Sequence, residues 1–287
     1  MSLPADAAIP LVWAHGDVEE RLGFRGGRYT RVNNVLSFLI GCVLTIAFYA
    51  ALFLGRDTYL YQMFTARGPV PYAIVLLSAW SAAILFIKSR KLAFQRRALD
   101  YPIVPSDATF VLSSATVDDV TNQILVTVDH PRQFVLFNRI LIALSNLRNL
   151  GRVADVDDIL RSQAEHDEAA METSYSLIQG FVWAIPVLGF IGTVLGLSEA
   201  IASFTDVLGG ATEVSQLAGA LRGVTAGLAT AFETTLEALV AALAIQLVLT
   251  ALKKAEEEFL DACAEYCVRN IVGRLRTMPF EQEVEEA

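Results

Sequence analysis

Two carboxyl groups and a threonine hydroxyl share one face of a stretch that is otherwise apolar. Glu233 and Glu237 are four residues apart and Thr230 precedes Glu233 by three, so a helix places all three together. A charged carboxyl group at bilayer depth is costly unless it is paired, protonated or in contact with water. Arg222, the one basic residue of this stretch, lies about 16 Å away along the helix. The carboxyl groups therefore face a wet cavity, hold protons or approach another subunit, and each alternative suggests a route for a small cation.

Small residues recur at helical spacing in the preceding apolar run, AIPVLGFIGTVLGL, which covers residues 184–197. They are Pro186, Gly189, Gly192 and Gly196. A second stripe of small residues precedes the glutamates and consists of Gly219, Gly223 and Gly227. Such stripes let two helices approach closely. Thr193 and Thr235 add hydroxyl groups to these runs, either for packing, since threonine can bond a carbonyl of its own helix, or for an ion path.

Four apolar runs are long enough to carry these residues across a bilayer. They cover residues 33–54, 70–87, 173–204 and 220–252. The last would form a helix about 50 Å long, which exceeds a hydrocarbon core of roughly 30 Å, so part of it must protrude. The chain is 54% hydrophobic and has a mean hydropathy of +0.47, and both values are typical of a polytopic membrane protein.

Basic residues predict which ends of the spans face the cytoplasm. They are frequent before residue 33, over 88–97 and at 253–254. The connection 55–69 holds two of them, and the connection 205–219 holds neither lysine nor arginine. Both chain termini are therefore expected in the cytoplasm, with two short connections on the outer side.

The polar segments complete an all-α architecture with a helical cytoplasmic domain. We expect a cytoplasmic N-terminal segment over 1–32, with a short helix on the membrane surface as one option. The cytoplasmic domain covers 88–172, and a cytoplasmic helix and tail cover 253–287. The pattern over 117–128 fits either a helix or a strand, and we favour a helix capped by Ser114 or Thr116. Apolar periodicity and an acidic first turn predict helices in the domain over 134–150 and 155–175. No break separates the last of these from the third span, which is compatible with one long helix.

Composition and motifs exclude several classes of function. The net charge of −9 argues against a nucleic-acid partner. The sequence has no phosphate-binding loop, no HExxH motif and no recognisable Ser-His-Asp arrangement, so we expect no enzymatic activity. Cys263 and Cys267 are four residues apart but lack further ligands nearby, so we expect neither a metal nor another cofactor.

The pattern Pro186-x-x-Gly189-x-x-Gly192-Thr193-x-x-Gly196 resembles the signature span of the MotA/TolQ/ExbB proton-channel family. The segment GLATAFETTLEALVAAL, residues 227–243, resembles the last span of that family. By this resemblance, Thr193 and Thr235 correspond to the threonines that line the ion path in TolQ- and ExbB-like members. The last-span glutamate of the family falls at Thr230, with Glu233 and Glu237 one and two turns further on.

The resemblance implies an assembly in the bacterial inner membrane. Members form a ring, usually a pentamer, around two copies of a single-span partner of the MotB/TolR/ExbD type, each with an essential aspartate. Protons, or alternatively sodium ions, pass from outside to that aspartate and then past the threonines, and the flow turns the ring. The ion path would be lined by Thr193, Thr235, Thr230, Glu233 and Glu237. Packing and partner contacts would involve Pro186, Gly189, Gly192, Gly196, Gly223 and Gly227.

Two functions are compatible with these residues. One is a conducting motor subunit, and the other is a non-conducting membrane scaffold whose glutamates hold a complex together. The four-span layout is closer to MotA-like members, whereas the motif around Thr193 is closer to TolQ- and ExbB-like members. The work performed is therefore open between motility, outer-membrane energy transduction, gliding or secretion, and phage defence.

Overall fold

The computed structural model describes residues 9–105, 110–113, 115–150, 153–208 and 214–275. The regular structure of these segments is helical, and their β-structure is limited to two isolated bridges, which confirms the all-α class. Contacts divide the chain into two compact units. We call them the membrane unit (residues 34–86 and 175–251) and the domain unit (residues 1–33, 87–174 and 252–287).

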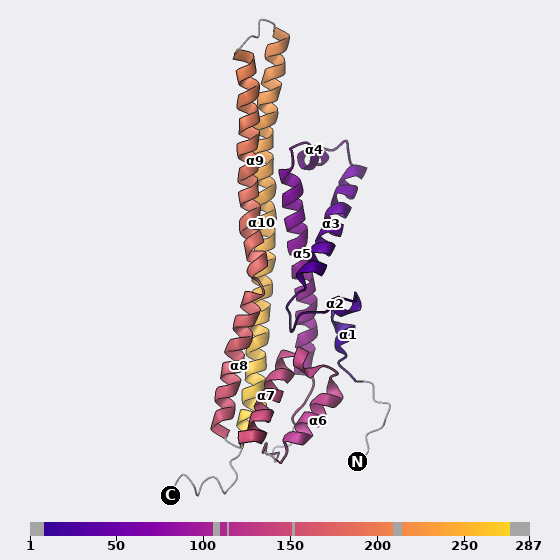
Figure 1. Cartoon of the computed structure of the whole chain (residues 1–287), viewed down its shortest axis with the longest axis vertical. Coiled ribbons are helices and arrows are strands. Elements are labelled where there is room, and N and C mark those ends of the chain that lie inside the picture. Colours follow the sequence, from indigo (N-terminus) through magenta and orange to yellow (C-terminus); the bar gives the residue numbers. More distant parts are fainter. Residues whose placement is uncertain (1–8, 106–109, 114, 151–152, 209–213, 276–287) are drawn as a thin grey trace. The chain divides into compact units, whose positions relative to one another are not determined.

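The membrane unit consists of long apolar helices and one short helix. Its elements are α3 (Asn34–Leu54), α4 (Tyr59–Thr65), the first part of α5 (Val70–Arg96), α9 (Ser176–Leu208) and the first part of α10 (Val214–Asn270). Helices α3, α5, α9 and α10 are each long and apolar enough to cross a bilayer. Figure 1 shows α9 and α10 side by side within this unit. The four predicted spans thus correspond to four helices.

A glycine and a tryptophan join α3 to α5. A Cβ atom at Gly41 would lie 2.8 Å from the Cα of Trp80, so the two helices touch at a position that admits no side chain. The Trp80 indole N–H donates to the Ser37 hydroxyl at 3.0 Å. The Trp80 ring also packs against Phe181 of α9, with ring centroids 4.7 Å apart. One large ring therefore ties the first helix pair to α9.

The domain unit is built around α7. Its elements are α1 (Trp13–Gly16), α2 (Val18–Arg21), η1 (Arg97–Asp100), α6 (Val117–Thr127), η2 (Pro131–Gln133), α7 (Val135–Leu150), α8 (Val153–Thr173), η3 (Val272–Arg274) and the last parts of α5 and α10. The predicted periodic face of α7 is buried, and Phe137 and Ile140 are both 0% exposed. The helices expected over 117–128 and 134–150 are therefore confirmed to within one residue.

The helix expected over 155–175 is interrupted by a two-residue turn before the third span. Helix α8 ends at Thr173, and α9 begins at Ser176. At the turn, the Ser174 hydroxyl donates to the Met171 carbonyl at 2.5 Å. Such a local side-chain bond offers the backbone an alternative to the helical pattern. Apart from this turn, residues 155–205 are helical, as the option of one long helix requires.

Both short connections between the apolar helices contain more helix than the sequence suggests. Helix α4 occupies half of the connection 55–69. Helix α9 extends to Leu208 and α10 begins at Val214, so the part of 205–219 that is described is mostly helical. At the other end, α10 stops at Asn270, and η3 follows it.

The described N-terminal residues belong to the core of the domain unit. Leu11 and Trp13 are 2% and 1% exposed. The Trp13 ring packs edge-on against Phe134, with centroids 5.3 Å apart. The Asp129 carboxylate accepts the Trp13 backbone N–H at 2.9 Å. A helix on the membrane surface is therefore wrong for this segment, because its apolar side chains complete a protein core instead.

The Asp129→Ala variant is expected to loosen the N-terminal segment. Asp129 accepts the backbone N–H of Trp13 and also that of His130, at 2.7 Å. Charged hydrogen bonds of this kind contribute about 2 kcal/mol together. Limited proteolysis should cut residues 9–33 at least tenfold faster in the variant. Asp118→Ala is the control, because the Asp118 side chain is 72% exposed; equal cleavage of both variants would contradict the expectation.

Buried basic side chains of the domain unit are paired with carboxylates. Salt bridges join Lys91 to Asp17 and Glu19, Lys88 to Glu256, and Arg139 to Asp167. Lys88 and Lys91 are each 1% exposed, so these two basic residues of 88–97 lie in the interior of the unit. Removing one partner of a buried ion pair leaves an uncompensated charge in the interior. Substitution of either partner is therefore expected to destabilise the unit.

Tyr29 of the N-terminal segment interacts electrostatically with the Arg139–Asp167 ion pair. Burial raises the pKa of the Tyr29 hydroxyl, and the neighbouring Asp167 carboxylate raises it further. The hydroxyl therefore stays protonated at neutral pH, where it accepts a hydrogen bond from Nδ2 of Asn138 at 3.0 Å.

Candidate functional site

Glycines bring α9 and α10 into backbone contact. A Cβ atom at Gly196 would lie 2.6 Å from the carbonyl oxygen of Gly227, and one at Gly227 would lie 2.5 Å from the carbonyl oxygen of Gly196. A Cβ atom at Gly189 would lie 2.5 Å from the Cβ of Ala238. These positions have no room for a side chain, so the glycines set the distance between the helices.

Gly192 and Gly223 also face this contact, and Pro186 interrupts the hydrogen bonding of α9. Gly192 abuts the side chain of Thr234, and a Cβ atom at Gly223 would lie 2.7 Å from the Ser203 hydroxyl. Pro186 lies inside α9, where it cannot donate the hydrogen bond that a helical residue gives to the carbonyl four positions earlier.

The hydroxyl groups of Thr193 and Thr235 are hydrogen-bonded to each other across the α9–α10 contact. Thr193 also reaches the Ala231 carbonyl at 3.1 Å, and Thr235 reaches the Gly189 carbonyl at 3.1 Å. A hydroxyl has one hydrogen to donate and two lone pairs to accept with. Two hydrogens therefore serve four oxygen atoms, and lone pairs are left for a water molecule or a small cation.

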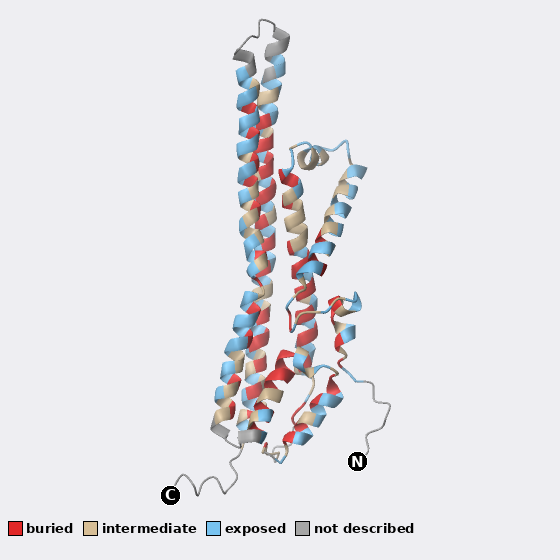
Figure 2. Ribbon diagram, viewed as in Figure 1, coloured by how far each residue is buried: buried red, intermediate tan, exposed pale blue. Residues whose placement is uncertain are grey.

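The threonine pair lies at the edge of the contact and not in its interior. Both threonines are half-buried. One helical turn away, Phe190 of α9 and Phe232 of α10 are 65% and 72% exposed. Figure 2 shows exposed positions along the outside of both helices and buried ones between them. We call the surface formed by Thr193, Thr235, Phe190 and Phe232 the threonine seam. An exposed apolar surface of this kind is normally covered by lipid or by another protein.

Glu233 has partners from the connection between α3 and α5. The Arg67 guanidinium donates from Nε to Oε2 at 2.7 Å and from Nη2 to Oε1 at 3.0 Å. The Tyr59 hydroxyl donates to Oε1 at 2.7 Å. A bidentate guanidinium and a hydroxyl satisfy a charged carboxylate well. Glu233 is therefore neutralised by Arg67, which comes from outside its own apolar stretch.

Glu237 lies one turn beyond Glu233 and is differently placed. Its side chain is 6% exposed, and neither carboxylate oxygen has a hydrogen-bond partner among the described residues. Tyr49 of α3 is close enough to interact with it electrostatically. The two glutamates, equivalent in the sequence pattern, thus occupy different environments.

The predicted ion-path residues fall on two faces of α10 and not on one. Thr235 faces α9, as the contact with Gly189 shows. Glu233 and Glu237 face the helices of the first hairpin. Thr230 shares their face, is 9% exposed, and donates its hydroxyl to the Ala226 carbonyl of its own helix at 3.1 Å. Within this chain these residues therefore do not form one continuous lining, and their part in an ion path stays a prediction.

The Arg67–Glu233 contact also fixes how far α10 extends past the first hairpin. The part of α10 before Glu233 covers 19 residues, about 28 Å of helix. Figure 1 shows α9 and α10 continuing beyond α4 in this unit. The protrusion expected from the length of 220–252 therefore lies on the α4 side, and Glu233 is level with the connection between α3 and α5.

Residues 136–264 match the sequence model of the MotA/TolQ/ExbB proton channel family. This segment of the chain is similar to that family, and it covers somewhat less than half of the chain. No curated protein and no solved structure matches the chain. The match and the four apolar helices indicate a multi-pass membrane protein.

The MotA/TolQ/ExbB match includes the threonine seam and both glutamates, but not the side chains that surround the glutamates. Tyr49, Tyr59 and Arg67 come from residues 34–86 and were missed in the sequence. Arg67 is one of two basic residues in its connection, which indicates an interfacial position. Its partner is 166 residues away, and no local pattern indicates that distance. Among the described residues, no group of three or more His, Cys, Asp or Glu side chains could hold a metal ion.

Proposed function

We propose that this chain is the ring-forming subunit of an ion-driven motor in the bacterial inner membrane. Copies of it, five in a homopentamer, surround two copies of a single-span partner of the MotB/TolR/ExbD type. Each partner helix brings an aspartate to the threonine seam, and ion flow past the seam is converted into mechanical work. Both termini lie in the cytoplasm in this arrangement.

The observation that supports this proposal is the position of the Thr193–Thr235 pair. Glycine contacts hold the hydroxyls together, and they lie at an edge flanked by exposed Phe190 and Phe232. If the threonines only packed two helices, their place would be the interior of the contact, where Thr234 lies at 0% exposure. A half-buried pair beside uncovered apolar rings is suited to an incoming helix.

We propose the proton as the transported ion, with sodium as the alternative. A hydroxyl group can both donate and accept, so a proton could be passed along the pair by exchange of hydrogens. The scaffold hypothesis has less support, because Glu233 has its ion-pair partner within the same chain and does not need a neighbouring subunit.

The Thr193→Val and Thr235→Val variants are expected to lower ion flux at least tenfold while the oligomer still assembles. Valine keeps the shape of threonine and removes only the hydroxyl group. The flux is measured in vesicles that contain the chain and a single-span protein of the MotB/TolR/ExbD type, by the decay of an imposed pH gradient. Replacing sodium with choline in the buffer distinguishes proton from sodium transport.

Thr225→Val is the matched control. It makes the same chemical change on the same helix, but the exposed Thr225 hydroxyl bonds the Leu221 carbonyl of its own helix. Its flux should stay within about twofold of the parent chain. Loss of the oligomer in the Thr193 and Thr235 variants, or no flux from the parent with any partner, would favour the scaffold.

A further inference from the structure

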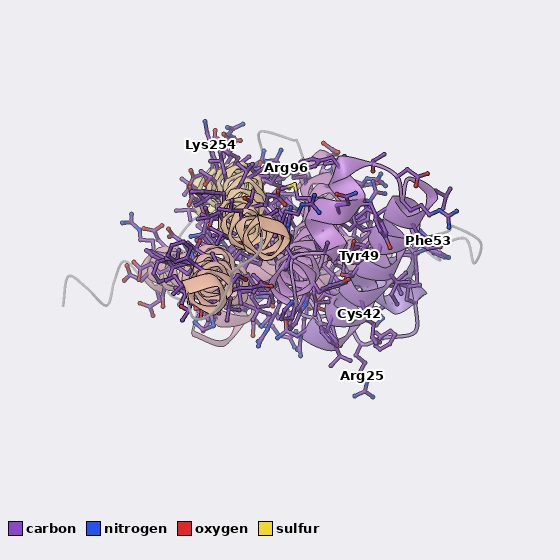
Figure 3. All side chains as sticks on the ribbon, turned by 90° about the horizontal axis from the view of Figure 1, so that it is seen from above. Arg25, Cys42, Tyr49, Phe53, Arg96 and Lys254 are labelled. Atoms are coloured by element: carbon purple, nitrogen blue, oxygen red, sulfur yellow. The ribbon has the colours of Figure 1, made fainter. Side chains whose placement is uncertain are left out.

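Glu237 and Tyr49 are two buried polar groups that lack hydrogen-bond partners. Both oxygen atoms of Glu237 and the hydroxyl of Tyr49 are buried, and none has a partner among the described residues. Tyr49 stacks on Tyr72 of α5, with ring centroids 4.7 Å apart and an interplanar angle of 22°. Seen from above, Tyr49 lies nearer than Phe53 to the orange ribbons of α9 and α10 (Figure 3). The pair is thus enclosed by three helices of one unit.

An unpaired polar group is expensive to bury, and a charged one much more so. Such groups in a packed interior indicate a missing component: a proton, a water molecule or a cation. The charged groups that act on Glu237 are Glu233 and Arg67, which largely neutralise one another in their ion pair. They leave Glu237 without a counter-ion of its own, and a bound proton removes the buried charge.

The Arg67–Glu233 ion pair lies between this site and the connection that faces outward in the predicted topology. The two side chains are 17% and 11% exposed, so they are within reach of water, whereas the Glu237 oxygens are not. The Tyr59 hydroxyl also donates to Glu233, so it covers the same side of the site. A proton that arrives from that side meets Glu233 first and Glu237 one turn later.

We propose that Glu237 and Tyr49 form a proton-binding site, separate from the threonine seam, whose outer side is closed by the Arg67–Glu233 ion pair. The site lies on the face of α10 opposite to Thr235. The assignment of this proton to the cycle of an ion-driven motor rests on the proposed function. The binding of the proton itself does not depend on a partner protein.

Dicyclohexylcarbodiimide tests for the bound proton directly. This apolar reagent reacts with protonated carboxyl groups in dry surroundings: the carboxyl oxygen bonds to the carbodiimide carbon, and the proton moves to a nitrogen. The full-length chain, in lipid vesicles, is treated from pH 5 to pH 9, and the modified residue is identified by mass spectrometry. We expect Glu237 to be modified, modification to fall with rising pH, and Glu237→Gln to abolish it.

Charge variants at the ion pair distinguish proton binding from simple exposure. Glu233→Gln removes a negative charge one turn away and should lower the midpoint pH of Glu237 modification by about one unit. Arg67→Gln removes the positive charge and should raise the midpoint by a similar amount. A general loosening of the unit would shift both variants in the same direction.

Three results would overturn the proposal. They are absence of modification at Glu237 throughout the pH range, protection by sodium chloride but not by choline chloride, and midpoint shifts of equal sign in the two variants. The outcome is independent of the proposed motor function, because Thr193→Val should leave the modification unchanged. If modification fails while Thr193→Val still abolishes flux, the proton site is wrong and the motor assignment stands.

Discussion

The Gly227→Ala variant is expected to lose about 3 kcal/mol of stability, although alanine is the better helix former. The added Cβ atom would lie 2.5 Å from the Gly196 carbonyl oxygen and 2.7 Å from the Ala200 backbone nitrogen. Backbone atoms cannot turn aside as a flexible side chain can, so α9 and α10 must separate. The threonine pair depends on that spacing, and it should be lost as well. Thermal unfolding of the protein in detergent measures the first effect, and ion flux the second.

Gly219→Ala provides the matched control. Gly219 lies on the same stripe two turns earlier, and a Cβ atom there would meet nothing within 4 Å. The substitution should therefore stabilise the protein by up to about 1 kcal/mol through helix propensity alone. Opposite signs for two identical substitutions on one helix would locate the α9–α10 contact. Equal stabilisation by both would show that Gly227 is not in contact with α9.

The spans and α7 were predictable because their signals are local. An uncharged apolar run of about 20 residues predicts a membrane-spanning helix. Apolar residues that recur every 3.6 positions predict an amphipathic helix with one buried face. The N-terminal segment had no such signal. The burial of Trp13 depends on Asp129, which is 116 residues away, and no local pattern reports that contact.

The site was predictable in part. The spacing of Gly189, Gly192 and Gly196 indicates a close helix contact whatever the partner helix is, and Thr193 accompanies it. The division of the polar residues also follows from helix geometry, since Glu233 and Thr235 are about 200° apart on a helix. Which helix each face meets does not follow from geometry. The contacts of Glu233 with Arg67 and Tyr59 show which helices its face meets, and both partners lie outside the segment that matches the family.

The Lys91→Met variant is expected to lose about 4 kcal/mol in the domain unit, the larger of the two stability effects. The Lys91 ammonium group contacts the carboxylates of Asp17 and Glu19, and it donates to the Arg31 carbonyl at 3.0 Å. All three charged side chains are 0% exposed. Methionine fills a similar volume but leaves two carboxylates buried without a counter-ion. Amide hydrogen exchange of α7 measures the loss where the core of the unit lies.

The same substitution at Lys254 separates buried pairing from loss of charge. The Lys254 side chain is 77% exposed and lies 4.0 Å from Glu258, so Lys254→Met should change stability by less than about 0.5 kcal/mol. Adding Glu19→Gln to Lys91→Met removes one uncompensated charge and should recover part of the loss. If the double variant recovered nothing, the cost would come from the packing of the lysine stem and not from the stranded carboxylates. The N-terminal segment would then be held by its apolar contacts, such as that of Trp13 with Phe134, rather than by charge.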